Sequence, residues 1–370
     1  MIQALARWAA DRWHGARPLP RTALRRLVGD APIAIIAGRN DAWERALRGA
    51  APGARILRPD TADLTRLDRY CADHGIRHLG LLALPAARAQ AVLAGVDTML
   101  GHARIDLVVL DGVASAASQH LARQDYVPLT EPGRKQRGGG AFLHRRLVAL
   151  TQAGAKRMLD LAALCRTHAV TPRGAIHVGA HEGQELDEYR AMGCRDVLMI
   201  EANPAVFARL EARCAAAPGL ILANCAISDR IGPVRLHVTS GDQSSSLLAL
   251  ARHQQHYPTI VEERIVEVRG TTLDALLAER GLDAARFNIL NLDIQGAELM
   301  ALKGGEGLLR HVEAINVEVN FEELYQGCAQ IEAIDDFLQR HGFRRVAVTC
   351  PFHRSWGDAF YVRGPAREAA

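Results

Sequence analysis

Residues 174–183 read GAIHVGAHEG, and residues 197–201, a short way downstream, read VLMIE. An apolar run leads into a glycine-containing turn, a helical stretch follows, and a second apolar run ends at a single acid, Glu201. Open α/β sheets hold adenosine groups with this arrangement of strand, turn, helix and strand. The stretch therefore predicts a nucleotide-cofactor site in a Rossmann-like α/β fold.

The spacing of the glycines and the acid narrows the class of cofactor. Only glycine lets backbone amides close on a ligand and accepts a positive φ, so Gly179 is the expected contact. Glu201 follows Gly179 by 22 residues, near the spacing at which a carboxylate reaches the ribose hydroxyls. The pattern is Gly-x-x-x-Gly and not the Gly-x-Gly-x-x-Gly of pyrophosphate-binding dehydrogenases, which favours a ligand without a diphosphate, such as S-adenosylmethionine. A tight turn in an ordinary α/β protein is the alternative.

Length and composition set the broad class. The chain of 370 residues is long enough for two domains, and its seven cysteines stand singly, without Cys-x-x-Cys pairs. No apolar run approaches the ~20 residues of a membrane span, and the first residues lack the apolar region of a signal peptide. These features predict a soluble cytoplasmic protein with no integral membrane segment.

The net charge of +4 divides unevenly, with +9 on residues 1–150 and −5 on the remainder. Nearly all the basic residues are Arg, but they are scattered and aromatic residues are few, so nucleic-acid binding is not expected. Residues 1–27 place apolar side chains at helical spacing among Arg residues. This predicts a docking helix, with a weak contact to an acidic membrane surface as the alternative.

The first half of the chain repeats the order of elements expected in the second half, with matching spacing from Thr65 and from Thr271 onward. We interpret this as a faint duplication; chance likeness between two α/β segments is the alternative. The first copy lacks polar strand ends, so residues 1–130 are expected to form a smaller, degenerate Rossmann-like domain without catalytic function. A linker rich in Pro, Gly and charge is expected at 131–140, with helices at 141–168 and the cofactor domain at 141–370.

Several strands of the second half are expected to end in polar side chains. The buried strand Phe287–Leu292 delivers Asp293 to the edge of the sheet where ligands of open α/β sheets bind, although Asp293 could also cap the next helix. Glu318 and Asn320 end the following strand, and Asn224 ends the strand expected to lie near the adenine. The polar stretch 241–246 is expected either to cover a substrate or to be a solvated connection.

The order of motifs over about residues 170–363 resembles the FkbM family of S-adenosylmethionine-dependent methyltransferases. The resemblance is carried by IHVGAHEG at 176–183, IEANP at 200–204, NCAISD at 224–229, TLD at 272–274, LDIQGAE at 292–298 with LKG at 302–304, and FYV at 360–362. It implies a mostly parallel class I methyltransferase sheet with an antiparallel last strand, and O-methylation of sugar, glycan or polyketide-like hydroxyls. The sequence departs from many members at His177, His181 and Asn291, where those have Asp, Asn and Lys.

Strand-end positions and the resemblance together give the candidate site residues. The catalytic candidates are Asp293, which would orient the acceptor hydroxyl or act as its base, together with His181 and Glu318. His237 could share that role. The cofactor candidates are His177, Gly179, Ala180, Glu182, Glu201, Asn203, Asn224, Ala226 and Asp293. The substrate-side candidates are Ser245, Gln295 and Asn320. No cluster has metal-ligand spacing, so no metal site is predicted.

Two other function classes stay open at this point: a nicotinamide-dependent oxidoreductase, and a non-catalytic Rossmann-like binding or scaffold protein. The missing Gly-x-Gly-x-x-Gly argues against the first. Retention of strand-end carboxylates argues against the second. The expected partners are a small-molecule or glycan acceptor, and assembly into a homo-oligomer stays open.

Overall fold

The computed structural model describes residues 24–25, 28, 32–37, 41–111, 115–129, 139–148, 158–214 and 217–364. The chain divides into two compact units, one of residues 1–157 with 349–354 and the other of residues 158–348 with 355–370. The helix expected within 1–27 and most of the linker expected at 131–140 lie outside the described residues.

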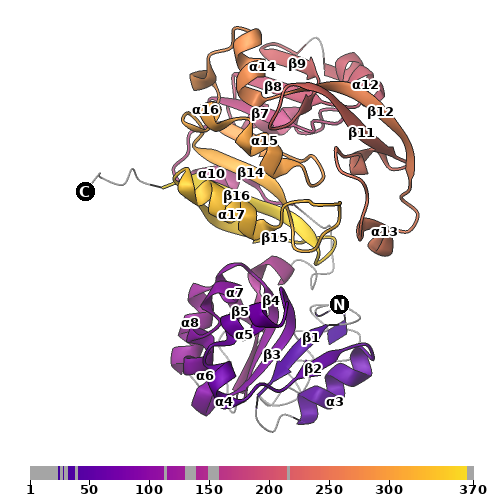
Figure 1. Ribbon diagram of the computed structural model, residues 1–370. Helices are drawn as coiled ribbons and strands as arrows, with labels where there is room; N and C mark the ends of the chain where they lie inside the picture. Colours follow the sequence, from indigo (N-terminus) through magenta and orange to yellow (C-terminus); the bar gives the residue numbers. More distant parts are fainter. Residues whose placement is uncertain are drawn as a thin grey trace. The chain divides into compact units, whose positions relative to one another are not determined.

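The first unit is a six-stranded α/β sheet. Its strands are β1 Ile33–Ile36, β2 Arg55–Leu57, β3 Leu79–Pro85, β4 Ile105–Asp111, β5 Tyr126–Pro128 and β6 Gly139–His144, in the order β2-β1-β3-β4-β6-β5. Its helices are α3 Asp41–Ala50, α4 Thr61–Leu64, α5 Leu67–Asp73, α6 Ala86–Ala94, α7 Asp97–Gly101 and α8 Ser115–Arg123, with a 3₁₀ turn at Arg145–Leu147. Helices cover both faces of the sheet (Figure 1). The central strands β3 and β4 are therefore almost wholly apolar and buried.

Strand β6 corrects the expected domain organisation. Residues 141–168 were expected to be helical and to belong to the second domain, but Gly139–His144 pairs antiparallel with β4, with Ala141 opposite Val109. A short apolar run such as Ala141–Leu143 fits a strand or a buried helix equally well from its pattern alone. The helix α10 begins only at Leu161, and the two units divide after Arg157.

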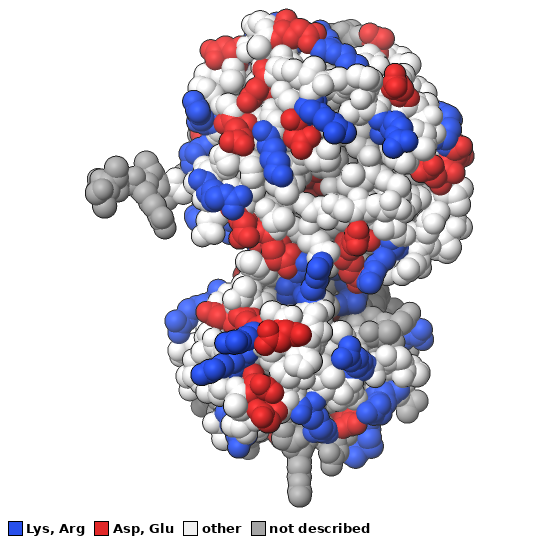
Figure 2. Space-filling view, viewed as in Figure 1, with Lys and Arg blue, Asp and Glu red and all other residues white. Residues whose placement is uncertain are grey.

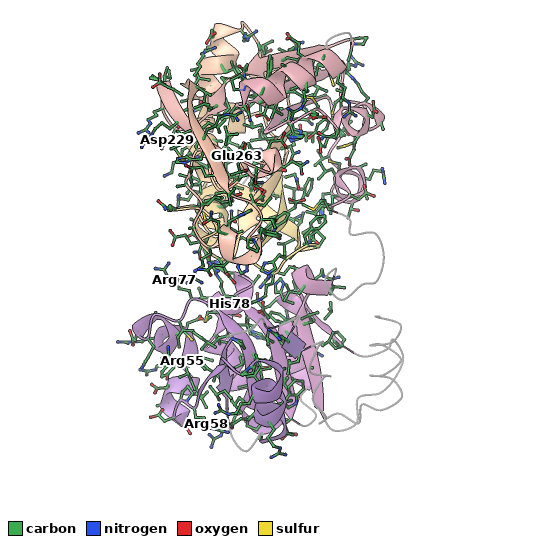
Figure 3. The ribbon with its side chains drawn as sticks, turned by 90° about the vertical axis from the view of Figure 1, so that its right-hand side faces the viewer. Arg55, Arg58, Arg77, His78, Asp229 and Glu263 are labelled. Carbon is green, nitrogen blue, oxygen red and sulfur yellow. The ribbon has the colours of Figure 1, made fainter. Side chains whose placement is uncertain are left out.

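A buried ion cluster lies in the first unit. Asp106 on β4 is fully buried and contacts Arg146 and Arg354, each at 2.5 Å, while Nε2 of His78 (Figure 3) lies 3.1 Å from it. Burial opposes ionisation of Asp106, but Arg354, His78 and Arg146 together hold its pKa well below the usual range. The polar side chain is thus satisfied inside the apolar sheet, as a structural feature.

The second unit contains the seven-stranded sheet expected from the motifs. Its strands are β7 Gly174–Val178, β8 Asp196–Glu201, β9 Leu220–Asn224, β13 Ile289–Leu292, β14 Ala314–Asn320, β15 Phe343–Thr349 and β16 Trp356–Arg363. The order is β15-β16-β14-β13-β7-β8-β9, and β16 runs antiparallel to β14. This confirms the predicted class, a mostly parallel Rossmann-like sheet with an antiparallel last strand.

The remaining elements of the second unit cover this sheet and extend it. The helices are α10 Leu161–Thr167, α11 Leu186–Ala191, α12 Pro204–Cys214, α14 Leu273–Glu279, α15 Glu298–Lys303, α16 Glu306–Leu309 and α17 Ile331–Arg340, with 3₁₀ turns η2 Asp242–Ser244 and η3 Ala284–Arg286. A small second sheet has the order β10-β12-β11, from Ala226–Ile227, Glu262–Thr271 and Gly232–Thr239. Strands β11 and β12 form a long twisted pair near the short helix α13 His253–His256 (Figure 1).

Neither acidic nor basic side chains predominate on the face of the molecule that Figure 2 shows. Acidic and basic side chains are interspersed over each unit (Figure 2). Among the described residues, no helix combines the length and apolar character needed to cross a bilayer.

Candidate active site

The carboxyl ends of four parallel strands meet at one edge of the second sheet. The register places Val178 beside Ile200 on one side and beside Leu292 on the other, and Leu292 in turn beside Val317. The residues that come next, Gly179, Glu201, Asp293 and Glu318, therefore gather at this edge. The sequence predicted all four as site residues.

Gly179 forms a close turn that no other residue would fit. Its φ is +85°, and a Cβ built on it would overlap the carbonyl oxygen of Asp293. The amides of Gly179 and Ala180 both donate to the carbonyl of Ile200, at 2.9 and 3.0 Å. The absent side chain thus lets the turn pack directly against the backbone of Asp293 at the end of β13, while both amides are paired with Ile200.

Glu201 is held rigidly by backbone amides at the end of β8. Its Oε1 accepts from the Asn203 amide at 2.7 Å and its Oε2 accepts from the His181 amide at 3.1 Å. Burial raises the pKa of Glu201, and the two amides oppose that rise. Each carboxylate oxygen keeps a second lone pair, so a pair of vicinal hydroxyl groups could be recognised at this position.

The other cofactor candidates have structural partners. The side chain of Asn203 accepts from the Ala205 amide at 3.1 Å and caps α12, and Asn224 donates to the carbonyl of Glu201 at 2.8 Å. Glu182 pairs with Arg209 at 2.6 Å on the surface, and Ala226 is buried in a small apolar cluster. These contacts show what each side chain does in the fold.

His177 belongs to a buried polar network on the same face of the sheet as Asp293. Its Nε2 lies 3.2 Å from the Asn291 amide nitrogen, and its Nδ1 lies 3.2 Å from the Tyr189 hydroxyl. Asn291 also accepts from Asn316 at 2.8 Å. Burial lowers the pKa of His177, so the ring is neutral.

His181 makes its hydrogen bonds to residues other than the carboxylates at the ends of β13 and β14. Its Nδ1 accepts from Gln184 at 3.0 Å, which leaves the proton on Nε2 to be donated to Asp242 at 3.1 Å. Asp242, on η2, also pairs with Arg209. His237 pairs with Glu262 at 2.6 Å. No hydrogen bond among the described residues joins either histidine to Asp293 or Glu318.

Four carboxyl groups surround the end of β13. Asp293 is exposed, whereas Glu318, Asp358 and Glu298 are at most 8% exposed. Burial raises the pKa of Glu318 well above its ordinary value, and the neighbouring Asp293 adds to that shift. Burial, with a smaller contribution from Asp293, likewise raises the pKa of Asp358. The group therefore places the exposed Asp293 beside buried carboxyl groups whose pKa values are raised.

Gln295 bridges this group. Its side-chain nitrogen donates to Oδ1 of Asp293 at 2.8 Å and to Oε2 of Glu318 at 2.5 Å. Its side-chain oxygen accepts from the Tyr325 hydroxyl at 2.6 Å. A residue predicted to touch the substrate is thus engaged with two catalytic candidates.

The two other substrate-side candidates differ in position. Ser245 accepts from the Thr239 amide at 3.2 Å and stabilises the turn after β11. Asn320 is fully buried at the end of β14, and neither its Oδ1 nor its Nδ2 has a hydrogen-bond partner in the part of the chain that the structure describes.

Sequence reasoning missed Asp358, Tyr325 and the pair of Tyr257 and Trp356. Asp358 lies opposite Glu318 in the antiparallel pair of β14 and β16. The Trp356 indole donates to the Tyr257 hydroxyl at 2.9 Å, and Tyr257 is electrostatically coupled to Glu318. Asp358 could be recognised only from the strand register, which is known once the chain has folded. The tyrosines and Trp356 carried no sequence signal.

No group of three or more His, Cys, Asp or Glu side chains within the described ranges has a geometry suited to a metal ion.

Comparisons with known proteins match this chain to methyltransferases. The family described as the methyltransferase FkbM domain matches residues 177–345. A 2-O-methyltransferase, NoeI, from Sinorhizobium fredii (strain NBRC 101917 / NGR234) is 26% identical over 171 residues, which cover 44% of this chain and 70% of that protein. The family match confirms the resemblance found in the motifs and decides against the nicotinamide-dependent alternative.

Two solved structures are similar at low identity. A methyltransferase FkbM from Methylobacillus flagellatus is 13% identical with a TM-score of 0.35, covering 98% of each chain. Magnesium protoporphyrin IX methyltransferase from Synechocystis is 9% identical with a TM-score of 0.32, covering 55% of this chain and 77% of that one. The fold assignment rests on the observed sheet order and not on these likenesses.

Proposed function

We propose, from the match of residues 177–345 to the methyltransferase FkbM domain, that the chain is an S-adenosylmethionine-dependent O-methyltransferase acting on a hydroxyl of a sugar, glycan or polyketide-like small molecule. The observation that carries the proposal is the placement of the exposed Asp293 beside the Gly179 turn, with Glu201 at the next strand end. This set combines a cofactor cradle with a proton acceptor at one sheet edge.

The residues present fit this cofactor. Gly179 brings the end of β7 into backbone contact with Asp293, and Glu201 is held at the next strand end, where its carboxylate can accept from ribose hydroxyls. The Gly179 turn contains no pyrophosphate-binding repeat of glycines. When bound, S-adenosylmethionine supplies an electrophilic methyl group on a sulfonium.

The chain's own residues then have two tasks. The acceptor hydroxyl has to be aligned with the methyl group, and its proton has to leave as the new C–O bond forms. Asp293 takes that proton, because it is the exposed carboxyl group at this edge and the buried ones cannot reach an acceptor from solvent. Glu318 stays protonated beside it and donates a hydrogen bond to its charge.

The acceptor class is supported by two observations. The relative NoeI is named a 2-O-methyltransferase. The partly exposed Trp356 and its partner Tyr257 give an amphipathic wall near Glu318, which can pack against a ring that carries hydroxyls. We propose that Asn320 lies on the acceptor side and orients a polar group there.

The first unit takes no part in cofactor binding under this proposal. Strands β1 and β3 end in Ala37 and in Leu84-Pro85, which offer no polar group to a ribose. Calorimetry of the full chain with S-adenosylmethionine tests this: one site per chain is expected, and it should vanish in a Gly179 variant. A second site that survives in that variant would contradict the proposal.

The reaction itself is tested with methyl-labelled cofactor. The protein is incubated with glycan and metabolite extracts, and labelled products are identified by mass spectrometry. Label in a methyl ether is the expected result. Label in an amine or a carboxyl ester only, or cofactor binding by NAD in place of S-adenosylmethionine, would contradict it.

A further inference from the structure

Gln295 has an unusual backbone conformation for its residue type. Its φ is +57°, in the left-handed region that side-chain-bearing residues rarely adopt. The hydroxyl of Ser246 donates to the Gln295 carbonyl at 2.8 Å, and the amides on either side, of Ile294 and Gly296, donate to the buried Glu298 at 3.0 Å each. The surrounding structure therefore fixes this strained residue in place.

The side chain is fixed at its other end as well. The Tyr325 hydroxyl donates to the side-chain oxygen of Gln295 at 2.6 Å, and Tyr325 is fully buried. The amide oxygen therefore lies on the Tyr325 side, and the amide nitrogen lies on the side of the two carboxyl groups. The two N–H groups then point to Asp293 and Glu318, one to each.

We infer that Gln295 is a positioning residue, which clamps Asp293 and Glu318 into one unit that holds a single proton and a single negative charge between them. The role given to the pair in catalysis rests on the proposed function. The clamp itself is a property of the chain without cofactor or acceptor.

The physical reason is that two adjacent carboxylates repel each other when both are ionised. A neutral amide that donates to both stabilises the singly charged pair without adding a counter-charge. It also stops the buried Glu318 and the exposed Asp293 from separating. The base facing the acceptor thus keeps a fixed position beside Glu318.

The titratable side chains near the pair are carboxyl groups, phenols and one neutral imidazole. They are Glu298 and Asp358, the phenols of Tyr257 and Tyr325, and the ring of His177. Hydrogen-bond donors therefore carry the stabilisation of charge here.

The test is an infrared titration of the carboxylic-acid C=O bands in the cofactor-free protein, with Asp293→Asn and Glu318→Gln used to assign the bands of the two side chains. Gln295→Leu removes both donors, so the singly charged pair is less stable relative to the doubly protonated pair, and the midpoint for loss of the first proton moves to higher pH. We expect the midpoint to rise by about one pH unit. Tyr325→Phe frees the amide to rotate and should shift the midpoint in the same direction by less.

Tyr361→Phe is the matched control. Tyr361 is equally buried and donates to Asp335 at 2.7 Å, away from the pair, so its loss should leave the midpoint unchanged. If Gln295→Leu fails to fold, Gln295→Asn replaces it, because Asn tolerates a positive φ while its shorter amide cannot reach both carboxyls. A titration in the folded Gln295 variant that superimposes on the wild type would overturn the inference. Failure of the proposed function would instead appear as absent cofactor binding with the shift intact.

Discussion

The Cα of Gly179 and the backbone carbonyl of Asp293 approach so closely that any side chain at 179 would overlap the carbonyl oxygen. The first residue belongs to the turn expected to receive the cofactor, and the second is the expected base. Their contact ties these two parts of the site together through backbone atoms. Cofactor geometry and base geometry are thus set by one packing relationship between adjacent strands β7 and β13.

Gly179→Ala should destabilise the protein by at least about 2 kcal/mol, because it adds steric overlap to the strain of a positive φ. S-adenosylmethionine binding should be lost. Gly281→Ala is the control: its φ is +61° but its Cβ would meet nothing within 4 Å, so about 1 kcal/mol is expected. Urea unfolding and calorimetry measure both effects. If both substitutions destabilised the protein equally, the overlap at Gly179 would have been relieved by movement of β7 away from β13.

Glu201→Ala should weaken S-adenosylmethionine binding by about 1.5–3 kcal/mol, the range for hydrogen bonds to a charged group. The carboxylate is held by two backbone amides and so is in position before the ligand arrives. Glu211→Gln is the control and changes an exposed acid on α12. Its affinity should stay within about twofold of wild type. An unchanged affinity in Glu201→Ala would remove that residue from the cofactor site.

Strand-end residues could be predicted because their position follows from pattern alone. Gly179, Glu201 and Asp293 each come directly after a buried apolar run, and the carboxyl ends of parallel strands share one edge. The sequence could not tell which way a strand-end side chain turns. Asn203 and Asn224 were predicted as cofactor contacts, and the structure shows each bonded to nearby backbone.

Residues that depend on distant pairing could not be predicted. Asp358 joins Glu318 only through the antiparallel register of β14 and β16, and Tyr325 reaches Gln295 from a loop. The strand β6 was mistaken for a helix for a related reason, since its place beside β4 comes from a long-range contact. Local pattern carries no information about such partners.

Glu298 should make stability depend on pH. Burial raises its pKa to about 7, so the folded state favours the protonated form. The stability that this proton supports is complete below the unfolded pKa of about 4.3 and is lost as the pH rises through about 7. Glu298→Gln should remove this dependence and be more stable than wild type above pH 7, by up to about 3 kcal/mol.

Urea unfolding at a series of pH values measures this effect. Glu306→Gln, which alters an exposed acid in the next helix, should leave the profile unchanged. A Glu298→Gln profile parallel to that of wild type would mean that Glu298 is ionised in the fold at all these pH values.

Asp293→Asn tests the base. A carboxylate that takes the acceptor's proton acts in the transition state, whereas one that holds the cofactor or caps a helix acts before the chemistry begins. Asn keeps the size of the side chain and still accepts from Gln295, but it cannot take a proton. We expect S-adenosylmethionine affinity within a few-fold of wild type and single-turnover methyl transfer slower by roughly 10²–10⁴-fold.

The control for Asp293→Asn is Asp358→Asn, in the same carboxyl group. Asp358 is buried and its pKa is raised well above the ordinary value, so it is already neutral and an amide replaces it with little change in charge. Methyl transfer should therefore fall by less than about tenfold in that variant. If Asp358→Asn is the slow enzyme and Asp293→Asn transfers methyl normally, the proton goes to the buried side of the group. A normal rate in both variants, with cofactor bound, would move the search to Glu318 and His181.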